Sequence, residues 1–448
     1  MSRPSEITIA GAGLVGSLLG VLLGQQGYKV RIIERRSDSR NDKVDSGRSI
    51  NLALSERGMH ALRLAGLMDD VEPLLIPMRG RMLHSVDGQT ELIPYGQRPH
   101  EVIYSVSRQK LNSLLLNAAE EASDVDVVFE QKVTDIDFDK RKLVSVDASS
   151  GRTESRSFEL LIGADGAGSR VRRSLIAKTE GSSRSEFLDH DYKEREIPAI
   201  EGKHAMEAEA LHIWPRGGYM LIALPNLDGS FTVTLFLPKT GDPSFESLND
   251  LAAVQHFFER QFPDALALMP DLTKDYQDNP TGRLGTVYCS PWHYEDCGLI
   301  LGDASHAIVP FHGQGMNAGF EDCSELLRLL EQANHDWAAT LPDFEQHRKP
   351  DADAIAKMAI ENYTTMRSSV IDEKFQLKKE IGFELERRFP EQFVPRYSMV
   401  MFHRVPYADA LRQGTQQQKI LAELVEGKSR LDEIDFEHAG RLIQDRLK

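Results

Sequence analysis

Three glycines near the start of the chain have the spacing of a loop that holds a diphosphate. Gly11, Gly13 and Gly16 follow the apolar run 7–10 and precede a second apolar run that reads as a helix. Gly11 allows a tight turn, Gly13 allows the backbone to approach a diphosphate, and Gly16 allows helix and strand to pack closely. The free N–H groups and partial positive charge of the helix N-terminus favour phosphate. These residues predict a dinucleotide-binding strand, loop and helix.

An acidic residue ends the next apolar run, 30–33. The carboxylate of Glu34 is placed to accept hydrogen bonds from ribose hydroxyls, as the acidic residue of such motifs does. Arg35 and Arg36 follow it and could offset the negative charge of a bound dinucleotide. A solvated surface cluster is the alternative interpretation of this basic pair.

Two later apolar runs end in a glycine followed closely by an aspartate, at Asp165 and at Asp303. Asp303 would lie at the carboxyl end of a strand, where open α/β sheets bind ligands, and could bind the hydroxyl groups of FAD. The segment 313–319 reads as a helix start whose N–H groups would favour negative charge at the flavin N1–O2 edge. The ordered set of three signatures predicts FAD.

These three signatures in this order resemble the group A FAD-dependent aromatic hydroxylases. Further segments resemble the kynurenine 3-monooxygenase family within that group, and the resemblance covers almost the whole chain. They are residues 47–58, 77–82, 93–96, 104–108, 310–317 and 395–397. The resemblance implies non-covalent FAD, NADPH as a transient co-substrate, and hydroxylation of L-kynurenine to 3-hydroxy-L-kynurenine by molecular oxygen. The resemblance also implies that the reaction belongs to tryptophan degradation and proceeds through a flavin C4a-hydroperoxide.

The implied substrate is an amino acid, whose carboxylate suits a fork-shaped guanidinium. The resemblance assigns this role to Arg81, with a second hydrogen bond from Tyr95. The two residues flank a turn at 87–88 within a predicted hairpin. Arg79 would lie on the same strand face as Arg81, so periodicity does not choose between them.

Three residues at i, i+3 and i+4 share one face of a predicted helix: Asn362, Thr365 and Met366. Asn362 could bind the amino or carboxyl group of the substrate. The family usually has a glutamate where Thr365 stands, so the expected partner of the substrate amino group is missing. An ordinary core face is the alternative.

Other substrate and flavin contacts are expected from single residues. Tyr397 matches a pocket position of the family, and His312 could approach the flavin or the substrate ring. Plain structural roles are the alternative for both. The apolar lining of the pocket is predicted to comprise Leu211, Ile222, Leu224 and Phe236.

The resemblance implies a set of FAD contacts along the chain. Within it, Arg108 would contact the diphosphate, while Arg48 and Leu54 would lie near the flavin. The absence of a second Gly-x-Gly-x-x-Gly motif fits transient NADPH binding. The predicted set is Gly11, Gly13, Leu14, Val15, Gly16, Glu34, Arg35, Arg36, Arg48, Leu54, Arg108, Val133, Asp165, Asp303, Pro310, Gly313, Gly315, Met316 and Asn317.

The composition excludes several other classes of protein. A net charge of −16 over 448 residues argues against nucleic acid or an anionic membrane as the main partner. Three cysteines without Cys-x-x-Cys spacing indicate a reducing compartment and no disulfide framework, and no zinc spacing occurs. No apolar run reaches about 18 residues, and the tail 416–448 is polar, so no membrane span is expected. We expect a cytoplasmic monomer or homodimer without a metal.

The predicted fold class is α/β. A discontinuous Rossmann-like FAD-binding domain would comprise 1–72, 98–182 and 282–345, with a mixed or antiparallel sheet for the substrate inserted at 73–97 and 183–281. A helical region would follow at 346–448. Alternating residues over 205–237 predict antiparallel strands with a hairpin turn at 226–229, and the polar stretch 181–198 reads as an interdomain loop.

Two other functions remain open from the residues alone. A flavin hydroxylase of the same kind could act on another anionic aromatic compound, and the threonine at position 365 favours this alternative. An FAD-binding redox sensor or scaffold without turnover is the third hypothesis, against which the Arg81 and Tyr95 pair argues.

Overall fold

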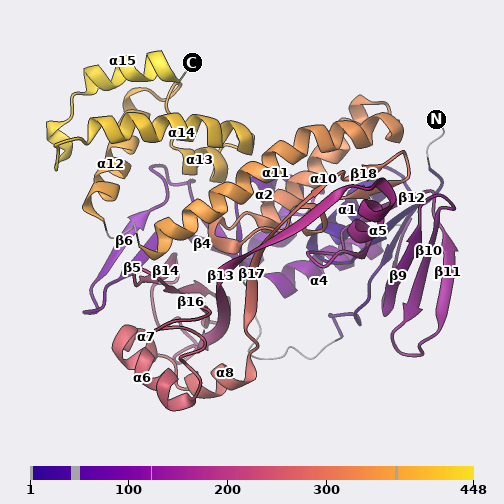
Figure 1. Ribbon diagram of the computed structural model, residues 1–448, viewed down its shortest axis with the longest axis horizontal. Helices are drawn as coiled ribbons and strands as arrows, with labels where there is room; N and C mark the ends of the chain where they lie inside the picture. Colours follow the sequence, from indigo (N-terminus) through magenta and orange to yellow (C-terminus); the bar gives the residue numbers. More distant parts are fainter. Residues whose placement is uncertain (1–3, 42–50, 123, 369–371, 448) are drawn as a thin grey trace. The chain divides into compact units, whose positions relative to one another are not determined.

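The computed structural model describes residues 4–41, 51–122, 124–368 and 372–447 (Figure 1). The chain divides into two compact units. Unit 1 comprises 1–75, 106–187 and 285–356, and unit 2 comprises 76–105, 188–284 and 357–448. Unit 2 therefore groups the C-terminal helices with the inserted strands, whereas the sequence suggested a separate helical region. The boundaries of the three predicted domains remain a prediction.

Unit 1 is built on a six-stranded sheet with the order β18-β19-β12-β1-β2-β8. β1 (Ile7–Ala10) pairs in parallel with both β2 (Val30–Ile33) and β12 (Leu160–Gly163). α1 (Leu14–Gln25) makes the connection from β1 to β2, and its apolar residues are almost fully buried. This βαβ unit is the one that the glycine spacing predicts. The sheet is completed by β8 (Val125–Val128), β18 (His293–Tyr294) and β19 (Gly298–Ile300).

The remaining elements of unit 1 surround this sheet. A separate antiparallel sheet has the order β11-β10-β9. The elements are α2 (Glu56–Leu64), α3 (Met68–Val71), η1 (Glu72–Leu74), α4 (Arg108–Glu121), β9 (Gln131–Asp137), β10 (Lys142–Asp147), β11 (Thr153–Ser157), α5 (Arg170–Thr179), α9 (Asp303–His306), η2 (Pro310–His312) and α10 (Gly315–Gln332). A further three-stranded sheet, whose strands are not all in unit 1, has the order β3-β7-β4, formed by β3 (Asn51–Leu54), β7 (Ile103–Ser107) and β4 (Leu75–Met78).

Unit 2 is organised by a seven-stranded mixed sheet with the order β17-β13-β16-β15-β14-β5-β6. β14 and β5 pair in parallel, and the other pairs for which a register is known are antiparallel. The strands are β5 (Gly80–His84), β6 (Thr90–Pro94), β13 (Ser182–Ile197), β14 (Ala210–Pro215), β15 (Met220–Pro225), β16 (Phe231–Pro238) and β17 (Gly282–Ser290). The predicted turn at 226–229 joins β15 to β16, where the Gly229 N–H donates to the Asn226 carbonyl.

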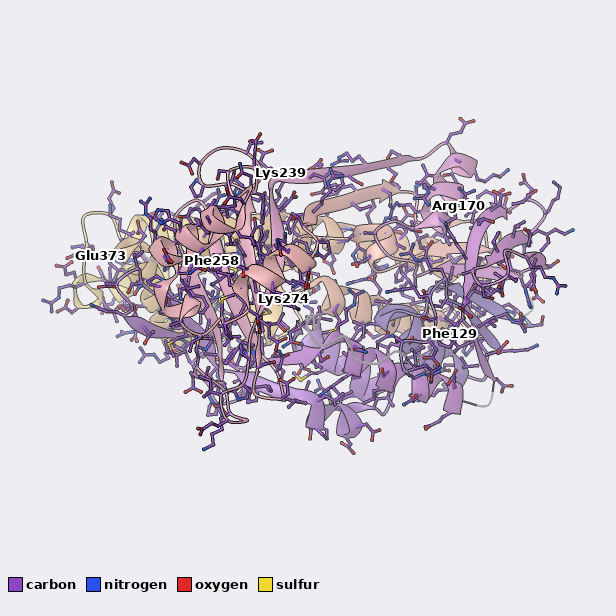
Figure 2. The ribbon with its side chains drawn as sticks, turned by 90° about the horizontal axis from the view of Figure 1, so that it is seen from below. Phe129, Arg170, Lys239, Phe258, Lys274 and Glu373 are labelled. Carbon is purple, nitrogen blue, oxygen red and sulfur yellow. The ribbon has the colours of Figure 1, made fainter. Side chains whose placement is uncertain are left out.

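One face of this sheet packs on short helices to form a core. Trp214, Leu221, Val233 and Leu235 alternate toward this face and are fully buried with Phe258 (Figure 2). The helices are α6 (Leu251–Gln261), α7 (Pro263–Leu266) and α8 (Leu272–Asp278). Burial of each large apolar side chain contributes about 1.5–3 kcal/mol, so this core holds the sheet together.

The C-terminal part of the chain is helical. α12, α14 and α15 share an apolar core that includes Ile381, Ile420 and Ile443, and Figure 1 shows α14 and α15 side by side. The helices are α11 (Trp337–Arg367), α12 (Glu373–Arg388), α13 (Arg396–Met401), α14 (Tyr407–Leu424) and α15 (Phe436–Arg446), with η4 (Leu431–Glu433) before the last.

The charges of the stretch 181–198 predicted a loop, and this prediction is wrong. It forms the long strand β13, which pairs with β16 from His190↔Pro238 to Ile197↔Phe231. The backbone is paired there, and the charged side chains range from exposed, as at Arg184, to buried, as at Arg195, which is 3% exposed. Side-chain polarity therefore gave no warning of this strand.

Candidate active site

The glycine loop of unit 1 is shaped for close approach by a ligand. Gly11 has φ +106°, and a Cβ there would lie 2.5 Å from the Ala164 carbonyl oxygen. A Cβ at Gly16 would lie 1.9 Å from the carbonyl oxygen of Gly11. Gly13 differs, because nothing lies within 4 Å of where its Cβ would be. Gly11 and Gly16 are therefore required by the fold, whereas the bare backbone at Gly13 borders open space of the kind that a diphosphate needs.

The N-terminus of α1 supplies donors to that space. The first intrahelical bond runs from the Ser17 N–H to the Gly13 carbonyl at 2.9 Å. The N–H groups of Leu14, Val15 and Gly16 precede it and are left to a ligand or to solvent. This geometry is the one in which a helix N-terminus binds phosphate.

Glu34 closes the other side of the loop. Its carboxylate is 7% exposed and accepts hydrogen bonds from the Ala12 N–H at 2.9 Å and the Arg36 N–H at 3.0 Å. The Arg36 guanidinium is mostly exposed and lies 3.2 Å from the same carboxylate. One carboxylate thereby fixes the loop after β1 and the loop after β2, with lone pairs remaining for a ribose hydroxyl.

The next predicted FAD contacts, apart from Arg48, belong to α4, β9, β3 and the loop after β2. Asn112 of α4 donates to the Ala12 carbonyl at 3.4 Å, and Arg108, one turn earlier on the same helix, is exposed. Val133 lies on β9, whose first residue donates from its N–H to the carbonyl of Glu34. Leu54 is fully buried at the end of β3, Arg35 is exposed, and Arg48 lies outside the described residues.

The two aspartates of the later signatures have different surroundings. Asp165 accepts hydrogen bonds from the Ser169 hydroxyl and from the N–H groups of Arg170, at 2.6 Å, and Val171, at 3.2 Å. It therefore organises the start of α5. Asp303 is exposed at the start of α9, and within the described ranges no protein group binds its carboxylate. Asp303 is the acid that remains available for the hydroxyls of a cofactor.

A buried ionic network that sequence reasoning missed holds the backbone beside Asp303. Asp322 of α10 accepts hydrogen bonds from the Gly302 N–H at 2.8 Å and from His306 at 2.6 Å. Arg348 donates to the same carboxylate at 2.8 Å and to Glu321 at 3.0 Å. Burial opposes each charge, but the partners prevail, so the pKa of His306 is raised and that of Asp322 is lowered.

The N-terminus of α10 is the second set of free N–H groups in unit 1. Ala318 makes the first intrahelical bond, to Gln314 at 2.8 Å, so the N–H groups of Gly315, Met316 and Asn317 precede it. The side chain of Asn317 is engaged elsewhere: it donates to the carbonyls of Ala53 and Gly313 at 2.8 and 2.7 Å. Only the backbone of Asn317 is therefore suited to a flavin contact.

The residues before α10 form a compact turn. Pro310 is exposed, His312 is 5% exposed within η2, and Gly313 follows with φ +65°. Together with the glycine loop, Glu34 and the unengaged Asp303, these donors and acceptors fit FAD. They supply N–H groups for the diphosphate, carboxylates for the hydroxyls, and a helix N-terminus for a flavin edge that becomes negative.

In unit 2 the hairpin of β5 and β6 places Arg81 beside Tyr95. Gly80↔Pro94 and Arg81↔Ile93 are register partners, and the Tyr95 N–H donates to the carbonyl of Arg79 at 3.0 Å. Tyr95 thus stands diagonally across from Arg81, within reach of a long side chain. The predicted hairpin is present, and it brings together two of the residues that the family resemblance selected.

A third residue, Tyr397 of α13, completes this cluster. The Tyr95 and Tyr397 rings stack with centroids 5.5 Å apart and planes inclined by 10°. The guanidinium carbon of Arg81 lies 5.6 Å from the Tyr95 centroid and 5.3 Å from the Tyr397 centroid. We call Arg81, Tyr95 and Tyr397 the clamp.

The clamp contains buried donors that lack a normal hydrogen bond. Within the described chain, Arg81 Nε and the Tyr95 hydroxyl are buried without a hydrogen bond of normal geometry, although Arg81 and Tyr397 lie close enough to the Tyr95 hydroxyl to lower its pKa. Tyr95 is only 4% exposed. Burial raises the pKa of both tyrosines, with the charge of Arg81 opposing the rise, so both hydroxyls stay protonated. A buried donor without a partner costs about 1–3 kcal/mol, so the clamp is suited to an acceptor from outside the protein.

Arg79 has a different environment, which separates it from Arg81. Its Nε lies 2.5 Å from a carboxylate oxygen of Glu209, and both side chains are about half exposed. Arg79 is therefore already paired at the surface, whereas no carboxylate among the described residues lies within ion-pair distance of Arg81.

The strand register places all four predicted lining residues on the face that carries Arg81. Leu211 is the register partner of Arg81, and Ile213 pairs with Ile222. Because alternate residues share a face, Leu211, Ile222 and Leu224 lie together, and Phe236 joins them as the partner of Met220. Leu211 and Leu224 are each 9% exposed and Phe236 is 3% exposed. An apolar surface thus adjoins a cationic group.

The end of α11 carries the predicted face of Asn362, Thr365 and Met366. Met366 is buried, the other two are partly exposed, and the Thr365 hydroxyl donates to the carbonyl of Glu361 at 3.3 Å. Glu361 pairs with Arg396 at 2.7 Å. This ion pair links the residue before Asn362 to the residue before Tyr397, so the end of α11 is tied to the helix of the clamp.

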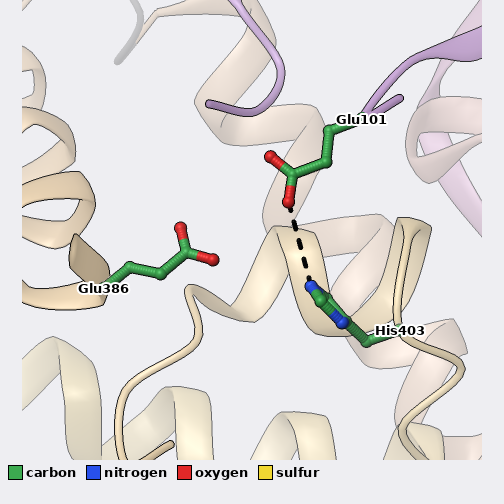
Figure 3. Close-up of side chains that lie close together, drawn as sticks. All are labelled: Glu101, Glu386 and His403. Atoms are coloured by element: carbon green, nitrogen blue, oxygen red, sulfur yellow. Dashed lines mark ion pairs between the residues drawn. The ribbon is translucent and has the colours of Figure 1, made fainter. Parts of the chain in front are cut away.

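Another acidic cluster in unit 2 has a structural explanation. Glu101 and Glu386 are buried and lie near His403 (Figure 3), with candidate ligand atoms within 4.8 Å of one another. Arg98 binds both carboxylates, reaching Glu386 at 2.9 Å, and Gln97 donates to Glu386 at 2.8 Å. The Arg98 guanidinium thus already supplies the positive charge that a bound metal ion would bring to these carboxylates.

Two bulk properties can be checked on the described residues. The three cysteines, Cys289, Cys297 and Cys323, are free and buried, and burial raises the pKa of Cys289 and Cys297 to about 11. Over the described ranges, no helix combines the length and apolar character that a membrane crossing requires.

Known proteins resemble this chain in both sequence and fold. Residues 5–359 match the FAD binding domain family. Kynurenine 3-monooxygenase of Myxococcus xanthus is 47% identical over 100% of this chain and 96% of its own length, and that of Stenotrophomonas maltophilia is 47% identical over 96% and 94%.

Solved structures share the fold at lower identity. p-Nitrophenol 4-monooxygenase of Pseudomonas putida has a TM-score of 0.68 at 17% identity and covers 91% of this chain and 99% of its own. 2-Methyl-3-hydroxypyridine-5-carboxylic acid oxygenase has a TM-score of 0.67 at 17% identity, over 92% and 97%. The fold and the FAD-binding class predicted from the sequence are thus confirmed, and the chain belongs to the kynurenine 3-monooxygenase family of FAD-dependent enzymes.

Proposed function

We propose that this protein hydroxylates L-kynurenine to 3-hydroxy-L-kynurenine, using FAD, NADPH and molecular oxygen. Relatives at 47% identity over nearly the whole chain carry the name of that activity. The observation that carries the proposal is the clamp, in which Arg81 Nε and the Tyr95 hydroxyl are buried donors without partners. A substrate carboxylate would satisfy both.

FAD, when bound, would supply the reduction of oxygen and the transfer of a hydroxyl group to the ring. The chain's own part is to hold the cofactor. Gly13 and the N–H groups of Leu14 and Val15 would take the diphosphate, with Arg108 nearby. Glu34 and Asp303 would take the hydroxyls, and the N–H groups at the start of α10 would face the flavin edge.

In unit 2 the chain would orient the substrate. The planar guanidinium of Arg81 would donate hydrogen bonds to the two carboxylate oxygens as a fork, and the Tyr95 hydroxyl would donate a further bond. The aniline ring would lie against the apolar face formed by Leu211, Ile222, Leu224 and Phe236. That face would exclude water from the reacting carbon, so that oxygen is used to hydroxylate the ring and is not released as hydrogen peroxide.

Asn362 is proposed to bind the substrate amino or carboxyl group, with Met366 and Tyr397 contributing to the walls. His312 remains our candidate for a residue that touches the flavin or the substrate ring. Thr365 cannot pair with an ammonium group as a glutamate would. Glu361, one turn earlier, already pairs with Arg396 at 2.7 Å. The chain therefore offers the substrate carboxylate a stronger partner than it offers the amino group.

That imbalance supports a second candidate function, hydroxylation of another anionic aromatic compound that lacks an α-ammonium group. The two candidates differ in a direct comparison of L-kynurenine with its deaminated analogue. Higher kcat/KM with L-kynurenine supports the first, and higher kcat/KM with the analogue supports the second. A redox sensor without turnover would show no coupled use of oxygen with either compound.

We further propose that the protein works in the cytoplasm, because three free, buried thiols suit a reducing compartment. We propose a monomer or a homodimer, with NADPH binding transiently. The experiment that tests the proposed function is a parallel record of NADPH oxidation, oxygen uptake and peroxide release by the FAD-loaded protein. L-Kynurenine should accelerate NADPH oxidation without equivalent peroxide, whereas peroxide equal to the NADPH consumed would show a non-substrate effector.

A further inference from the structure

A second cationic side chain lies beside the clamp. Lys379 of α12 donates from Nζ to the carbonyl oxygen of Pro94 at 2.6 Å. Pro94 is the last residue of β6 and directly precedes Tyr95. Lys379 Nζ also lies 5.4 Å from the ring centroid of Phe383, one turn later on the same helix. The ammonium group is therefore held against the backbone that positions the Tyr95 side chain.

The charges that face Lys379 come from both strands of the hairpin. Arg81 of β5 repels its positive charge and Glu91 of β6 attracts it, while burial disfavours the charged form. Burial and then the charge of Arg81 lower the pKa of Lys379 to about 7, against the opposing effect of Glu91. No carboxylate in the described part of the chain lies within ion-pair distance of either Arg81 or Lys379.

Two neighbouring cations without a paired anion are an unfavourable arrangement in a partly buried place. The Tyr95 hydroxyl, on the residue after Pro94, is buried and makes no hydrogen bond of normal geometry within the described chain. A carboxylate offers about four lone pairs on two oxygens, enough for Arg81, Tyr95 and an ammonium group together. The same anion would satisfy the orphaned donors and remove the repulsion between the cations.

We propose that Lys379 is a third substrate-binding residue, which acts with Arg81 and Tyr95 on the carboxylate of the substrate. This assignment rests on the proposed function, because it takes the substrate to be an aromatic carboxylate. Binding of the anion favours the ammonium form of Lys379, so the enzyme takes up a proton from solvent as the substrate binds. The carboxylate end of the substrate is thereby recognised by two cations, while position 365 leaves its amino end without an acid.

Calorimetry of the FAD-loaded enzyme tests this role through proton uptake. L-Kynurenine is titrated at about pH 7 in two buffers of different ionisation enthalpy, for the parent, Lys379→Arg and Lys379→Met. The parent should take up about half a proton per site, because a group whose pKa equals the pH is half protonated. Lys379→Arg should bind with similar affinity and no proton uptake. Lys379→Met should lose the uptake and bind about tenfold or more weakly.

The controls separate this role from general damage to the fold. Lys378→Met changes the adjacent lysine of the same helix and should leave both affinity and proton uptake at the parent values. FAD absorbance and thermal unfolding should be unchanged in all variants. The decarboxylated analogue of L-kynurenine should bind the parent and Lys379→Met alike. Parent affinity for L-kynurenine should fall between about pH 6 and pH 8, whereas Lys379→Arg should show no such fall.

Parent-like affinity and proton uptake in Lys379→Met would overturn the assignment. Failure of the parent to bind L-kynurenine would instead refute the proposed function. In that case the same three proteins, titrated with benzoate as an aromatic carboxylate, still decide the role of Lys379. Loss of proton uptake with benzoate in Lys379→Met supports it, and identical titrations of parent and variant refute it.

Discussion

Tyr95 and Tyr397 stack with their ring centroids 5.5 Å apart and their planes inclined by 10°, one just after β6 and the other on α13. Arg81 lies within 6 Å of both ring centroids, a distance at which a cation is attracted to an aromatic face. The two rings restrict the guanidinium, so little side-chain entropy remains to be lost when a carboxylate binds. This arrangement makes the clamp sensitive to the shape of its cation as well as to its charge.

Arg81→Lys should weaken L-kynurenine binding, because the charge is kept but the planar fork is lost. Loss of one charge-assisted hydrogen bond should cost on the order of 1.5–3 kcal/mol, roughly tenfold to over a hundredfold in Kd. Fluorescence titration measures the Kd, and FAD content should stay normal. Arg79→Lys is the matched control, since its partner is Glu209 at the surface. If Arg79→Lys were the damaging change, the carboxylate would be bound elsewhere.

Tyr95→Phe should weaken binding less than Arg81→Lys does. The ring and its stacking on Tyr397 are kept, and only a neutral donor is removed, which is worth about 0.5–1.5 kcal/mol. The change also removes a buried hydroxyl that has no partner in the free protein, so the variant should unfold at the same temperature or slightly higher. A lower unfolding temperature together with unchanged affinity would show that the hydroxyl has a structural role.

Thr365→Glu should tighten L-kynurenine binding, because it adds a carboxylate to the helix face shared by Asn362 and Met366. The deaminated analogue should bind more weakly to this variant, since two carboxylates would repel each other. Thr364→Glu places the same charge on an exposed neighbour and is the control. Equal effects of the two substitutions on both compounds would remove position 365 from the site.

Asp303→Ala should lower FAD occupancy, because the unengaged carboxylate is available for cofactor hydroxyls. Absorbance of the purified protein and fluorescence titration of the apoprotein measure the effect. Asp165→Ala should act differently: it removes the acceptor of the Arg170 and Val171 N–H groups at the start of α5, at a cost of about 0.5–2 kcal/mol in stability, and should leave the intrinsic FAD affinity closer to that of the parent. Unchanged FAD affinity in Asp303→Ala would exclude that residue.

Asp322→Asn should weaken FAD binding indirectly and change the pH dependence of stability. Breaking a buried ion pair costs about 3–5 kcal/mol. The raised pKa of His306 means that its contribution is complete below the ordinary value of 6.5 and is lost as pH rises through the folded-state pKa. The lowered pKa of Asp322 means that its contribution is present above 3.8 and is lost as pH falls through the folded-state pKa.

Urea unfolding of the parent and Asp322→Asn should therefore differ most between about pH 4 and pH 6.5, with the gap closing on both sides. Glu325→Gln alters a pair on the same helix, with Arg328, whose members are more exposed. That control should cost at most about 1 kcal/mol. A stability difference independent of pH would show that the ion pair does not hold the Gly302 backbone.

Local constraints explain what could be predicted from the sequence. Gly16 is required by its contact with Gly11 inside the βαβ unit, and Gly11 by its positive φ and its contact with Ala164 after β12. The spacing of the glycines was enough to predict the loop, although one of these contacts comes from a distant segment. The shared face of Leu211, Ile222, Leu224 and Phe236 followed from alternation along β14 to β16, because period-two patterning determines the face; their role in lining a pocket stays a prediction. Polar character misled at 181–198, because polar and charged residues there form the paired strand β13.

Contacts between distant segments account for what could not be predicted. Arg79 and Arg81 share a strand face, and only the position of Glu209 separates them. Lys379 gave no local signal, because its partners lie on β5 and β6, far away along the chain. The carboxylate of Asp165 and the side chain of Asn317 matched family motifs, yet both are engaged by neighbouring backbone groups.

Identification of the product tests the central claim most directly. The FAD-loaded enzyme is incubated with L-kynurenine, NADPH and isotopically labelled oxygen, and the product is examined by mass spectrometry and NMR. We expect one labelled oxygen atom on the ring carbon next to the amino-bearing carbon, because the aniline nitrogen donates electron density to that position. NADPH consumption that yields only hydrogen peroxide, with L-kynurenine recovered unchanged, would contradict it.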